Sequence, residues 1–246
     1  MPLSCAPALP QDMPGLIKAQ YSAFYPMEPL HDIIYPGPPT PANLATALWR
    51  QLSSMAAEGG ATFLKVTDDD TGALVAGAKW FVYEDEAKRH EGHVNVDWVG
   101  EEGSKERAWA QEVMDQFVGR RARRMKGKHA LLDLCFCAPT HQARGAGSLL
   151  VSWGCRTADS LNIPAFVEAS MPGQRLYEKH GFVATEDVKL SPARVGGGED
   201  RFGPQPELRY LFMERGVQGK KEGLGGWREA EGGRRWVPGE TDVVEK

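Results

Sequence analysis

The strongest chemical signal in the sequence is a glycine-containing loop, Gln142-Ala143-Arg144-Gly145-Ala146-Gly147-Ser148. An apolar run from Leu131 to Cys137 precedes the loop, and an amphipathic segment follows it. A helix that begins at such a loop presents unpaired backbone N–H groups and the positive end of its dipole to an anion. Gly145 and Gly147 let the backbone approach a ligand closely, and Arg144 adds a cation. This combination predicts a phosphate-binding loop.

A second motif, Tyr177-Glu178-Lys179-His180-Gly181-Phe182, begins 30 residues after Gly147. A dinucleotide-binding G-x-G-x-x-G motif is absent, because position 150 is Leu150. In this order and at this spacing, residues 131–182 resemble the GCN5-related N-acetyltransferase (GNAT) superfamily. In that family the Q/R-x-x-G-x-G/A loop holds the pyrophosphate of acetyl-CoA, so the resemblance implies that residues 142–148 bind this cofactor. An ordinary glycine turn before a helix is the alternative interpretation.

The resemblance assigns backbone roles to the strand before the loop. Aligned on the Q-x-x-G-x-G motif, the amide of Cys135 would face the thioester oxygen as an oxyanion donor. The amide and carbonyl of Cys137 would pair with the pantetheine arm, much as an added strand pairs. Ser170 stands where many relatives carry a cofactor-contacting Asn. The two thiols are then packing groups. A nucleophilic cysteine is the alternative, and no Cys-His arrangement in the sequence favours it.

The candidate proton donor is Tyr177, which matches a family tyrosine that lies near the sulfur of the cofactor. An ordinary tyrosine has a pKa of about 10 and an ordinary thiol a pKa of about 8.5. The hydroxyl therefore stays protonated when a thiolate leaves, and it can donate to that thiolate. The alternative is a tyrosine that only packs against the cofactor or the core.

The candidate general base is Glu168. On a strand over 164–170 it shares a face with Ser170, and from there it could take the proton of an amine directly or through water. A carboxylate satisfied by a neighbouring strand or by solvent is the alternative. Glu84, Glu86 and His141 are weaker candidates.

Periodicity and turn residues predict the elements that position these residues. Helices are expected over 12–24, 40–60, 104–124, 147–161 and 174–180, and strands over 61–67, 73–83, 131–137, 164–170, 182–190 and 207–215. A first strand must come from Leu3 to Leu9, where Pro7 weakens it. The helix over 147–161 is expected to bury Leu149, Leu150 and Trp153.

This order matches the α/β fold of the GNAT superfamily, a mixed, mostly antiparallel twisted sheet flanked by helices. We expect residues 1–215 to form one acetyltransferase domain. Residues 216–246 are rich in Gly, Glu, Lys and Arg, and this composition predicts a largely disordered tail.

Composition excludes several classes of protein. The 246 residues carry a formal net charge of −4, which gives no global attraction to nucleic acid or to an anionic membrane. No apolar run approaches the roughly 20 residues of a membrane span, and the N-terminus lacks a secretory signal. The four cysteines show no metal-ligand spacing and no disulfide framework, so we expect no metal and a cytoplasmic protein with reduced thiols.

One basic run, Arg120 to Lys128, could bind RNA, act as a nuclear signal or approach the 3′-phosphate of CoA. A solvated helix end is the interpretation that we favour, and nucleic-acid binding is not expected. The aromatic segment Lys79 to Tyr83 could line an acceptor pocket, but core packing is the interpretation that we favour.

The sequence therefore predicts an acetyl-CoA-dependent N-acetyltransferase that moves the acetyl group directly to an amine in a ternary complex. A small-molecule amine is favoured over a protein as acceptor, but the sequence does not identify it. The alternative is a non-catalytic, CoA-binding regulatory module.

Overall fold

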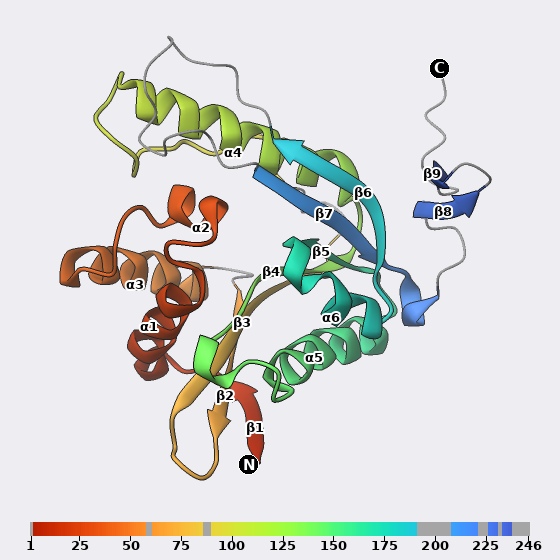
Figure 1. Cartoon of the computed structure of the whole chain (residues 1–246), viewed down its shortest axis with the longest axis horizontal. Helices are drawn as coiled ribbons and strands as arrows, with labels where there is room; N and C mark the ends of the chain where they lie inside the picture. The colour runs from red at the N-terminus through yellow and green to blue at the C-terminus, as the bar shows by residue number, and fades with distance from the viewer. Residues whose placement is uncertain are drawn as a thin grey trace.

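The computed structural model of the protein describes residues 2–57, 61–85, 90–190 and 208–220, and the backbone of 226–230 and 233–237. Its centre is a seven-stranded sheet in the order β1-β2-β3-β4-β5-β7-β6. The strands are β1 (Leu3–Pro7), β2 (Thr62–Asp68), β3 (Leu74–Tyr83), β4 (His129–Cys137), β5 (Ala165–Ala169), β6 (Val183–Leu190) and β7 (Leu208–Arg215). Only β4 and β5 run parallel, and every other neighbouring pair is antiparallel. The predicted mixed, mostly antiparallel sheet is confirmed (Figure 1).

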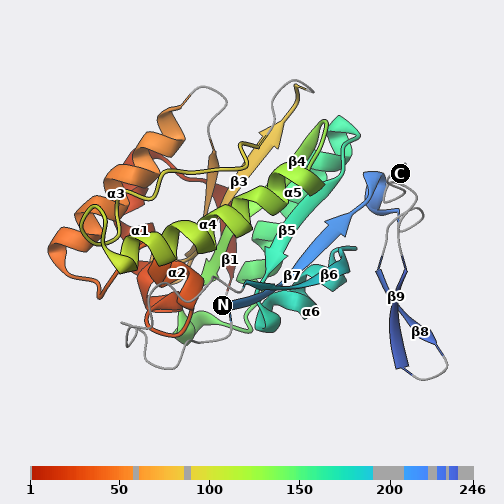
Figure 2. The same cartoon turned by 90° about the horizontal axis from the view of Figure 1, so that it is seen from above.

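Six α-helices flank the sheet in the described part of the chain: α1 (Met13–Phe24), α2 (Pro29–Ile34), α3 (Pro41–Ala56), α4 (Lys105–Arg124), α5 (Ala146–Leu161) and α6 (Gln174–Lys179). Helix α5 packs on one face with Val167 of β5, whereas α4 packs on the opposite face with the adjacent residue, Phe166. Helix α1 shares the face of α4 and packs on Phe136 of β4 (Figure 2). The sheet is thus covered on both sides.

Local signals explain where most helices begin and end. The Thr40 hydroxyl accepts a hydrogen bond from the Asn43 amide at the start of α3, and the Ser104 hydroxyl accepts one from the Arg107 amide at the start of α4. Helix α5 ends at Asn162, which has left-handed dihedral angles. Helix α2 lies inside the proline-rich connection and was not predicted from the sequence.

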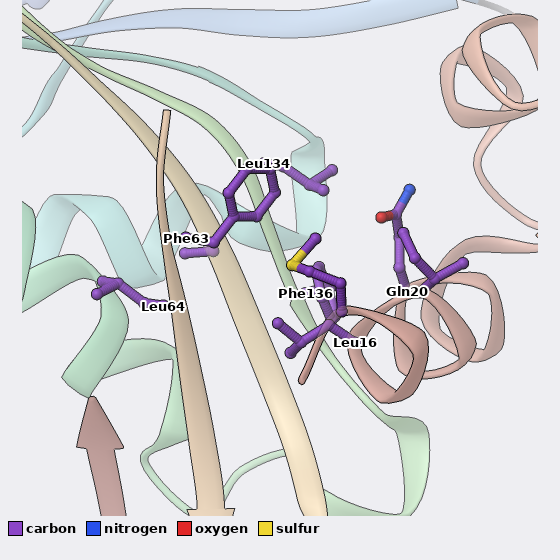
Figure 3. A pocket seen from close by; sticks show the side chains of 9 residues that line it. Leu16, Gln20, Phe63, Leu64, Leu134 and Phe136 are labelled. Atoms are coloured by element: carbon purple, nitrogen blue, oxygen red, sulfur yellow. The ribbon is translucent and has the colours of Figure 1, made fainter. Parts of the chain in front are cut away.

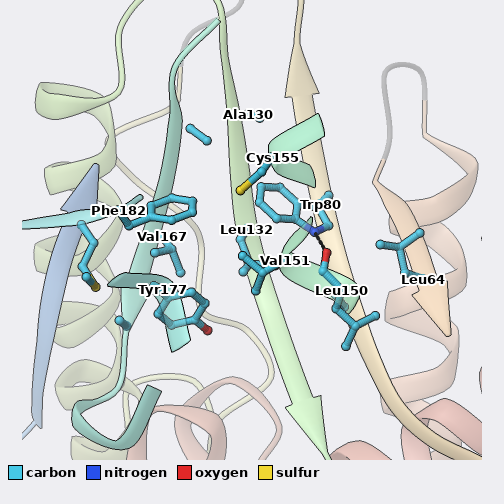
Figure 4. Packing of buried hydrophobic residues seen from close by; sticks show 14 of the residues in the cluster. Leu64, Trp80, Ala130, Leu132, Leu150, Val151, Cys155, Val167, Tyr177 and Phe182 are labelled. Atoms are coloured by element: carbon cyan, nitrogen blue, oxygen red, sulfur yellow. Dashed lines mark hydrogen bonds between the residues drawn. The ribbon is translucent and has the colours of Figure 1, made fainter. Parts of the chain in front are cut away.

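The core between α5 and the sheet is built around Trp80 of β3 (Figure 4). Its indole is fully buried, and Nε1 donates to the Leu150 carbonyl at 3.3 Å. Helix α5 buries Leu150 as expected and leaves Trp153 partly buried. The prediction for Leu149 is wrong, since this side chain is 36% exposed on the outer face of the helix.

The C-terminal segment contains two strands, β8 (Gly226–Ala230) and β9 (Gly233–Val237), which pair with each other in an antiparallel hairpin. The composition of this segment predicts a largely disordered tail, and the structure differs by this hairpin. Residues 221–225, 231–232 and 238–246 lie outside the described part. Among the described residues, none of the helices combines the length and apolar character that crossing a membrane requires.

A small cavity lies between α1 and the sheet, and Leu16, Gln20, Phe63 and Phe136 are among the residues that line it (Figure 3). Its volume of about 10 Å³ is at most that of a single water. This cavity is therefore too small for a substrate or a cofactor.

Candidate active site

The candidate site is the place where β4 and β5 separate. The two strands pair only from Ala130 to Leu132 and from Ala165 to Val167. Beyond these residues, β4 continues along β3 while β5 continues along β7 (Figure 4). Parallel strands that diverge in this way leave backbone groups free for a ligand, because neither strand continues the ladder of the other.

A bulge in β4 redirects the side chains just past the divergence. Opposite Lys79 and Trp80 of β3 the register shifts, so Asp133 is the extra residue between Leu132 and Leu134. Leu132 packs on the α5 face and Leu134 on the α1 face. Cys135 and Cys137 therefore return to the α5 face, where both pack against the core around Trp80.

The backbone of Cys135 and Cys137 faces the divergence. The Ala138 amide donates to the Val75 carbonyl at 2.9 Å, so Ala138 bonds toward β3. Because backbone groups alternate along an antiparallel pair, those of Cys137 and Cys135 point away from β3. The Gln142 side-chain amide donates to the Cys137 carbonyl at 3.3 Å. These are the backbone groups that the resemblance assigned to the thioester and the pantetheine arm.

The glycine loop holds its amides at the start of α5. Ala143 and Gly145 have left-handed φ angles of 60° and 94°, which turn the chain sharply into the helix. The first bond within the helix runs from the Leu149 amide to the Gly145 carbonyl, at 3.2 Å. The amides of Ala146, Gly147 and Ser148 precede that bond, so the helix does not use them. Such amides, with the helix dipole behind them, favour a phosphate.

Neighbouring side chains fix this loop in place. The Arg144 guanidinium donates to the buried Asp68 carboxylate at 2.7 Å and holds the pKa of Asp68 below its ordinary value. The Ser148 hydroxyl lies 2.9 Å from Nε2 of His180. A Cβ at Gly147 would lie 2.9 Å from the Leu176 side chain, whereas one at Gly145 would meet nothing within 4 Å. Gly147 thus serves the packing of α5 on α6, and Gly145 serves the turn.

Tyr177 of α6 lies beside Cys135 on the α5 face of the sheet. Burial raises the pKa of Tyr177 well above 10, and the neighbouring Cys135 raises it further. Burial also raises the pKa of the Cys135 thiol to about 12. Both groups are therefore protonated at neutral pH. A Cβ at Gly173 would lie 3.0 Å from the Tyr177 ring and 3.5 Å from the Ser170 hydroxyl oxygen, which places Ser170 close to the tyrosine.

The diverging strands and the glycine loop lie within a segment that matches a known protein family. Residues 75–182 match the model of the acetyltransferase (GNAT) family. This range contains β3, the diverging strands, the glycine loop and Tyr177. Residues 75–182 belong to the GNAT family. This match supports acetyl-transfer activity in general, and the fold of the family binds acetyl-CoA.

Solved structures of similar fold are also GNAT or N-acetyltransferase enzymes, at low identity. Arylalkylamine N-acetyltransferase 2 from Aedes aegypti has a TM-score of 0.61 and 10% identity, covering 88% of this chain and 100% of that chain. Polyamine N-acetyltransferase from Drosophila melanogaster has a TM-score of 0.58 and 14% identity, covering 87% and 98%. A phosphinothricin acetyltransferase from Sinorhizobium meliloti in complex with AcCoA has a TM-score of 0.52 and 14% identity, covering 88% and 89%. These similarities show the GNAT fold.

Glu168, the predicted base, lies on the α4 face of β5, opposite Tyr177. Its carboxylate is 3% exposed and is bound by Arg121 of α4. Nε of Arg121 lies 2.9 Å from both carboxylate oxygens, and Nη2 lies 2.6 Å from one. Burial raises the pKa of Glu168, and the Arg121 charge opposes this rise. The structure therefore places Glu168 in a buried ion pair rather than as a free carboxylate.

The same guanidinium also binds Asp133, which sequence reasoning did not single out. Nη1 of Arg121 donates to Asp133 at 2.8 Å, and the Lys79 ammonium lies 3.2 Å from the other carboxylate oxygen. These two cations hold the pKa of Asp133 at about 2, against the effect of burial. No local signal reveals this group, because its four members come from β3, β4, β5 and α4. We call Lys79, Asp133, Arg121 and Glu168 the charge cluster.

The basic run at the end of α4 is solvated only in part. Arg123, Lys126 and Lys128 are exposed, as predicted. Arg120 pairs with Glu186 of β6, and Arg124 donates to Glu214 of β7 at 2.7 Å. Together with Arg121, these two arginines connect α4 to the sheet.

The weaker base candidates are not brought to the site. Glu84 is exposed after β3, and Glu86 lies outside the described residues. His141 precedes the loop and contacts Thr140, with 2.9 Å between Nδ1 and the hydroxyl oxygen.

Proposed function

We propose that this protein is an acetyl-CoA-dependent N-acetyltransferase that transfers the acetyl group directly to a small amine in a ternary complex. Two features of one chain segment carry the proposal. The backbone of Cys135 and Cys137 faces the divergence of β4 and β5, and the loop that follows leads to amides at the start of α5 that the helix does not use. This arrangement suits a ligand with a diphosphate at one end and an extended amide-bearing arm.

In this proposal the amides of Gly145, Ala146, Gly147 and Ser148 bind the diphosphate, together with the turn at Gln142 and Ala143. Arg144 contributes through its ion pair with Asp68, which holds the loop, rather than by a direct contact to phosphate. The backbone of Cys137 pairs with the pantetheine arm. Ser170 is the first residue after β5, the strand that diverges from β4. The acetyl-CoA bound to a similar fold in the Sinorhizobium meliloti enzyme supports this choice of cofactor.

The reaction forms one N–C bond and breaks one C–S bond. The amine nitrogen attacks the thioester carbon, and the Cys135 amide stabilises the oxyanion of the tetrahedral intermediate. When the intermediate collapses, the CoA sulfur leaves as a thiolate, and the Tyr177 hydroxyl donates to it. Holding both reactants in one site removes the entropic cost of a bimolecular encounter.

The amine must lose a proton in this reaction. Burial raises the pKa of Glu168, but both of its oxygens accept hydrogen bonds from Arg121, which would have to break before this carboxylate could bind a proton. Asp133 has a pKa of about 2, so we assign the proton of the amine to neither carboxylate. We therefore infer that the amine attacks as its free base, and that water takes the proton which the nitrogen loses after N–C bond formation and returns a proton to Tyr177, restoring its hydroxyl.

We favour a small amine over a protein segment as the acceptor. Phe81 and Tyr83 stack at 5.9 Å on the α4 face of β3, and the Lys79 ammonium lies 4.9 Å from the Phe81 ring centroid. Aromatic rings suit an apolar or cationic small molecule. Two of the proteins with similar folds are named for arylalkylamines and polyamines, which supports the same choice.

A thermal melt with and without acetyl-CoA tests the cofactor. Ligand at about a hundredfold over its Kd stabilises the fold by about 2.7 kcal/mol, which is roughly 5–10 °C at this size. Release of CoA thiol in the presence of a panel of amines then tests turnover. A melting shift without thiol release for any amine would support the alternative, a CoA-binding regulatory module. No shift at millimolar acetyl-CoA would contradict both.

A further inference from the structure

The charge cluster lies where the pairing of β4 and β5 ends. Leu132 and Val167 form the last pair of the parallel ladder. The next residue of β4 is Asp133, and the next residue of β5 is Glu168. Arg121 binds the carboxylates of both. One guanidinium thus connects the two strands at the first position where their backbones no longer pair.

The geometry of this contact is specific to arginine. Nε and Nη2 face Glu168 as a fork, while Nη1 reaches Asp133 in another direction. A lysine ammonium is a point charge on a flexible stem and cannot hold both carboxylates in a fixed plane. The guanidinium also packs against the Phe117 ring, because its central carbon lies 4.6 Å from the centroid of that ring.

The two carboxylates repel each other unless the Arg121 guanidinium lies between them. Asp133 and Glu168 are like charges on adjacent strands, and the side chain of Glu168 is 3% exposed. Among the described residues, Lys79 is the other cation paired with this group, and it contacts Asp133 rather than Glu168. Without Arg121, the repulsion of the two carboxylates would widen the gap between the strands or force one carboxylate to bind a proton.

Asp133 is also the bulge residue of β4. The bulge turns the Cys135 side chain toward Tyr177 and fixes the direction of the Cys135 amide. Any movement of Asp133 therefore moves the peptide that is proposed to stabilise the oxyanion.

We propose that Arg121 is a positioning residue that sets the separation of β4 and β5, and with it the orientation of the Cys135 amide. This inference deepens the proposed function and, in its catalytic consequence, rests on it. Arg121 itself touches neither the thioester nor the amine. It acts through Asp133 and Glu168, and its contribution belongs to turnover and to binding of the pantetheine arm, not to binding of the diphosphate.

The test compares Arg121→Lys with a matched control, Arg124→Lys, on the same helix. Arg124 also ties α4 to the sheet through Glu214, but it lies outside the divergence. We expect Arg121→Lys to lower kcat/KM for acetyl-CoA at least tenfold, and Arg124→Lys to change it less than threefold. Binding of adenosine 3′-phosphate 5′-diphosphate, which keeps the diphosphate but lacks the pantetheine arm, should be unchanged in both variants. Equal turnover in the two variants would overturn the inference.

A second variant separates positioning from folding. Arg121→Met with Glu168→Gln removes one charge of each sign, so stability should be higher than in Arg121→Met alone, while turnover should stay low. Turnover restored together with stability would mean that Arg121 only stabilises the fold, and would overturn the inference.

Hydrogen exchange tests the inference without any activity. In the protein without ligand, amides of β4 and β5 should exchange at least fivefold faster in Arg121→Lys than in Arg124→Lys. If the wild type transferred no acetyl group, the proposed function would fail, yet the exchange comparison would still decide the role of Arg121. Equal exchange in the two variants would overturn that role.

Discussion

The indole of Trp80 lies directly against the Cα of Gly154. A Cβ at position 154 would lie 2.2 Å from two ring atoms, and the ring is fully buried between β3 and α5. The hydrogen bond from Trp80 Nε1 to the Leu150 carbonyl holds the ring in this position. The missing side chain at Gly154 therefore determines how closely α5, and the glycine loop at its start, approaches the sheet.

Gly154→Ala should destabilise the fold by about 3 kcal/mol or more, because a clash with a buried ring cannot relax cheaply. At this chain length the loss corresponds to a decrease in Tm of roughly 6–12 °C, measured by calorimetry. Gly119→Ala in α4 is the matched control, since its Cβ would meet atoms only at 3.4 Å and beyond. That change should leave Tm within about 3 °C of the wild type. Equal losses in the two variants would contradict the packing argument.

Tyr177→Phe should lower kcat for acetyl transfer about tenfold or more and leave the acetyl-CoA melting shift unchanged. The phenyl ring keeps the packing but cannot donate to the departing thiolate. Because the pKa of Tyr177 is raised well above 10, wild-type activity should show no loss from tyrosine ionisation up to pH 10. Steady-state rates of the two proteins between pH 7 and 10 test both points. An unchanged kcat would assign Tyr177 to packing alone.

Gly145→Val should abolish the acetyl-CoA melting shift. The φ of 94° strains any side chain there, and a β-branched residue would distort the amides at the start of α5. Gly103→Val is the control, since Gly103 has a φ of 76°, also with nothing within 4 Å of its Cβ, but lies before α4. Both variants should lose stability without ligand, and only Gly103→Val should keep the shift. Loss of the shift in both would mean that general destabilisation, not the loop, explains the result.

The sequence predicts the order of the elements well because its signals are local. The Asp-rich turn over residues 68–72 marks the hairpin of β2 and β3, the cap at Ser104 marks the start of α4, and the glycine loop marks the start of α5. The backbone roles predicted for Cys135 and Cys137 follow from the resemblance to the GNAT family, aligned on the glycine loop that comes after their strand, and not from a local signal at these two residues.

The charge cluster could not be predicted, because sequence spacing does not show which strands α4 covers. Arg121 and Glu168 are 47 positions apart and meet only when both β4 and β5 are in place. The bulge at Asp133 adds a second obstacle, since it reverses the alternation of side chains within one strand. For the same reason the basic run resembles a solvated helix end in the sequence, although Arg120, Arg121 and Arg124 pair with the sheet.

Stability should fall as pH decreases from about 6.5 to about 4, and His31 should account for part of the fall. His31 is 5% exposed among aromatic rings, its Nε2 lies 3.0 Å from Nε2 of Gln20, and burial lowers its pKa to about 4. An unfolded histidine has a pKa near 6.5, so in this window the unfolded state binds one more proton than the folded state. Above pH 6.5 both states are neutral at this position and the effect vanishes.

His31→Gln should therefore reduce the pH slope of the unfolding free energy by up to about 1.4 kcal/mol per pH unit between pH 6 and 4.5. His90 has a pKa lowered to about 4 and His129 a pKa lowered below its ordinary value, so part of the slope should remain in the variant. Urea unfolding at pH 7.5, 6.0, 5.25 and 4.5 measures the slope for each protein relative to its own value at pH 7.5. Removing the imidazole also changes packing, which shifts the whole curve equally at every pH. If the plots of unfolding free energy against pH were parallel for the wild type and His31→Gln, the prediction would be wrong. His31 would then bind a proton in the folded protein as readily as in the unfolded chain.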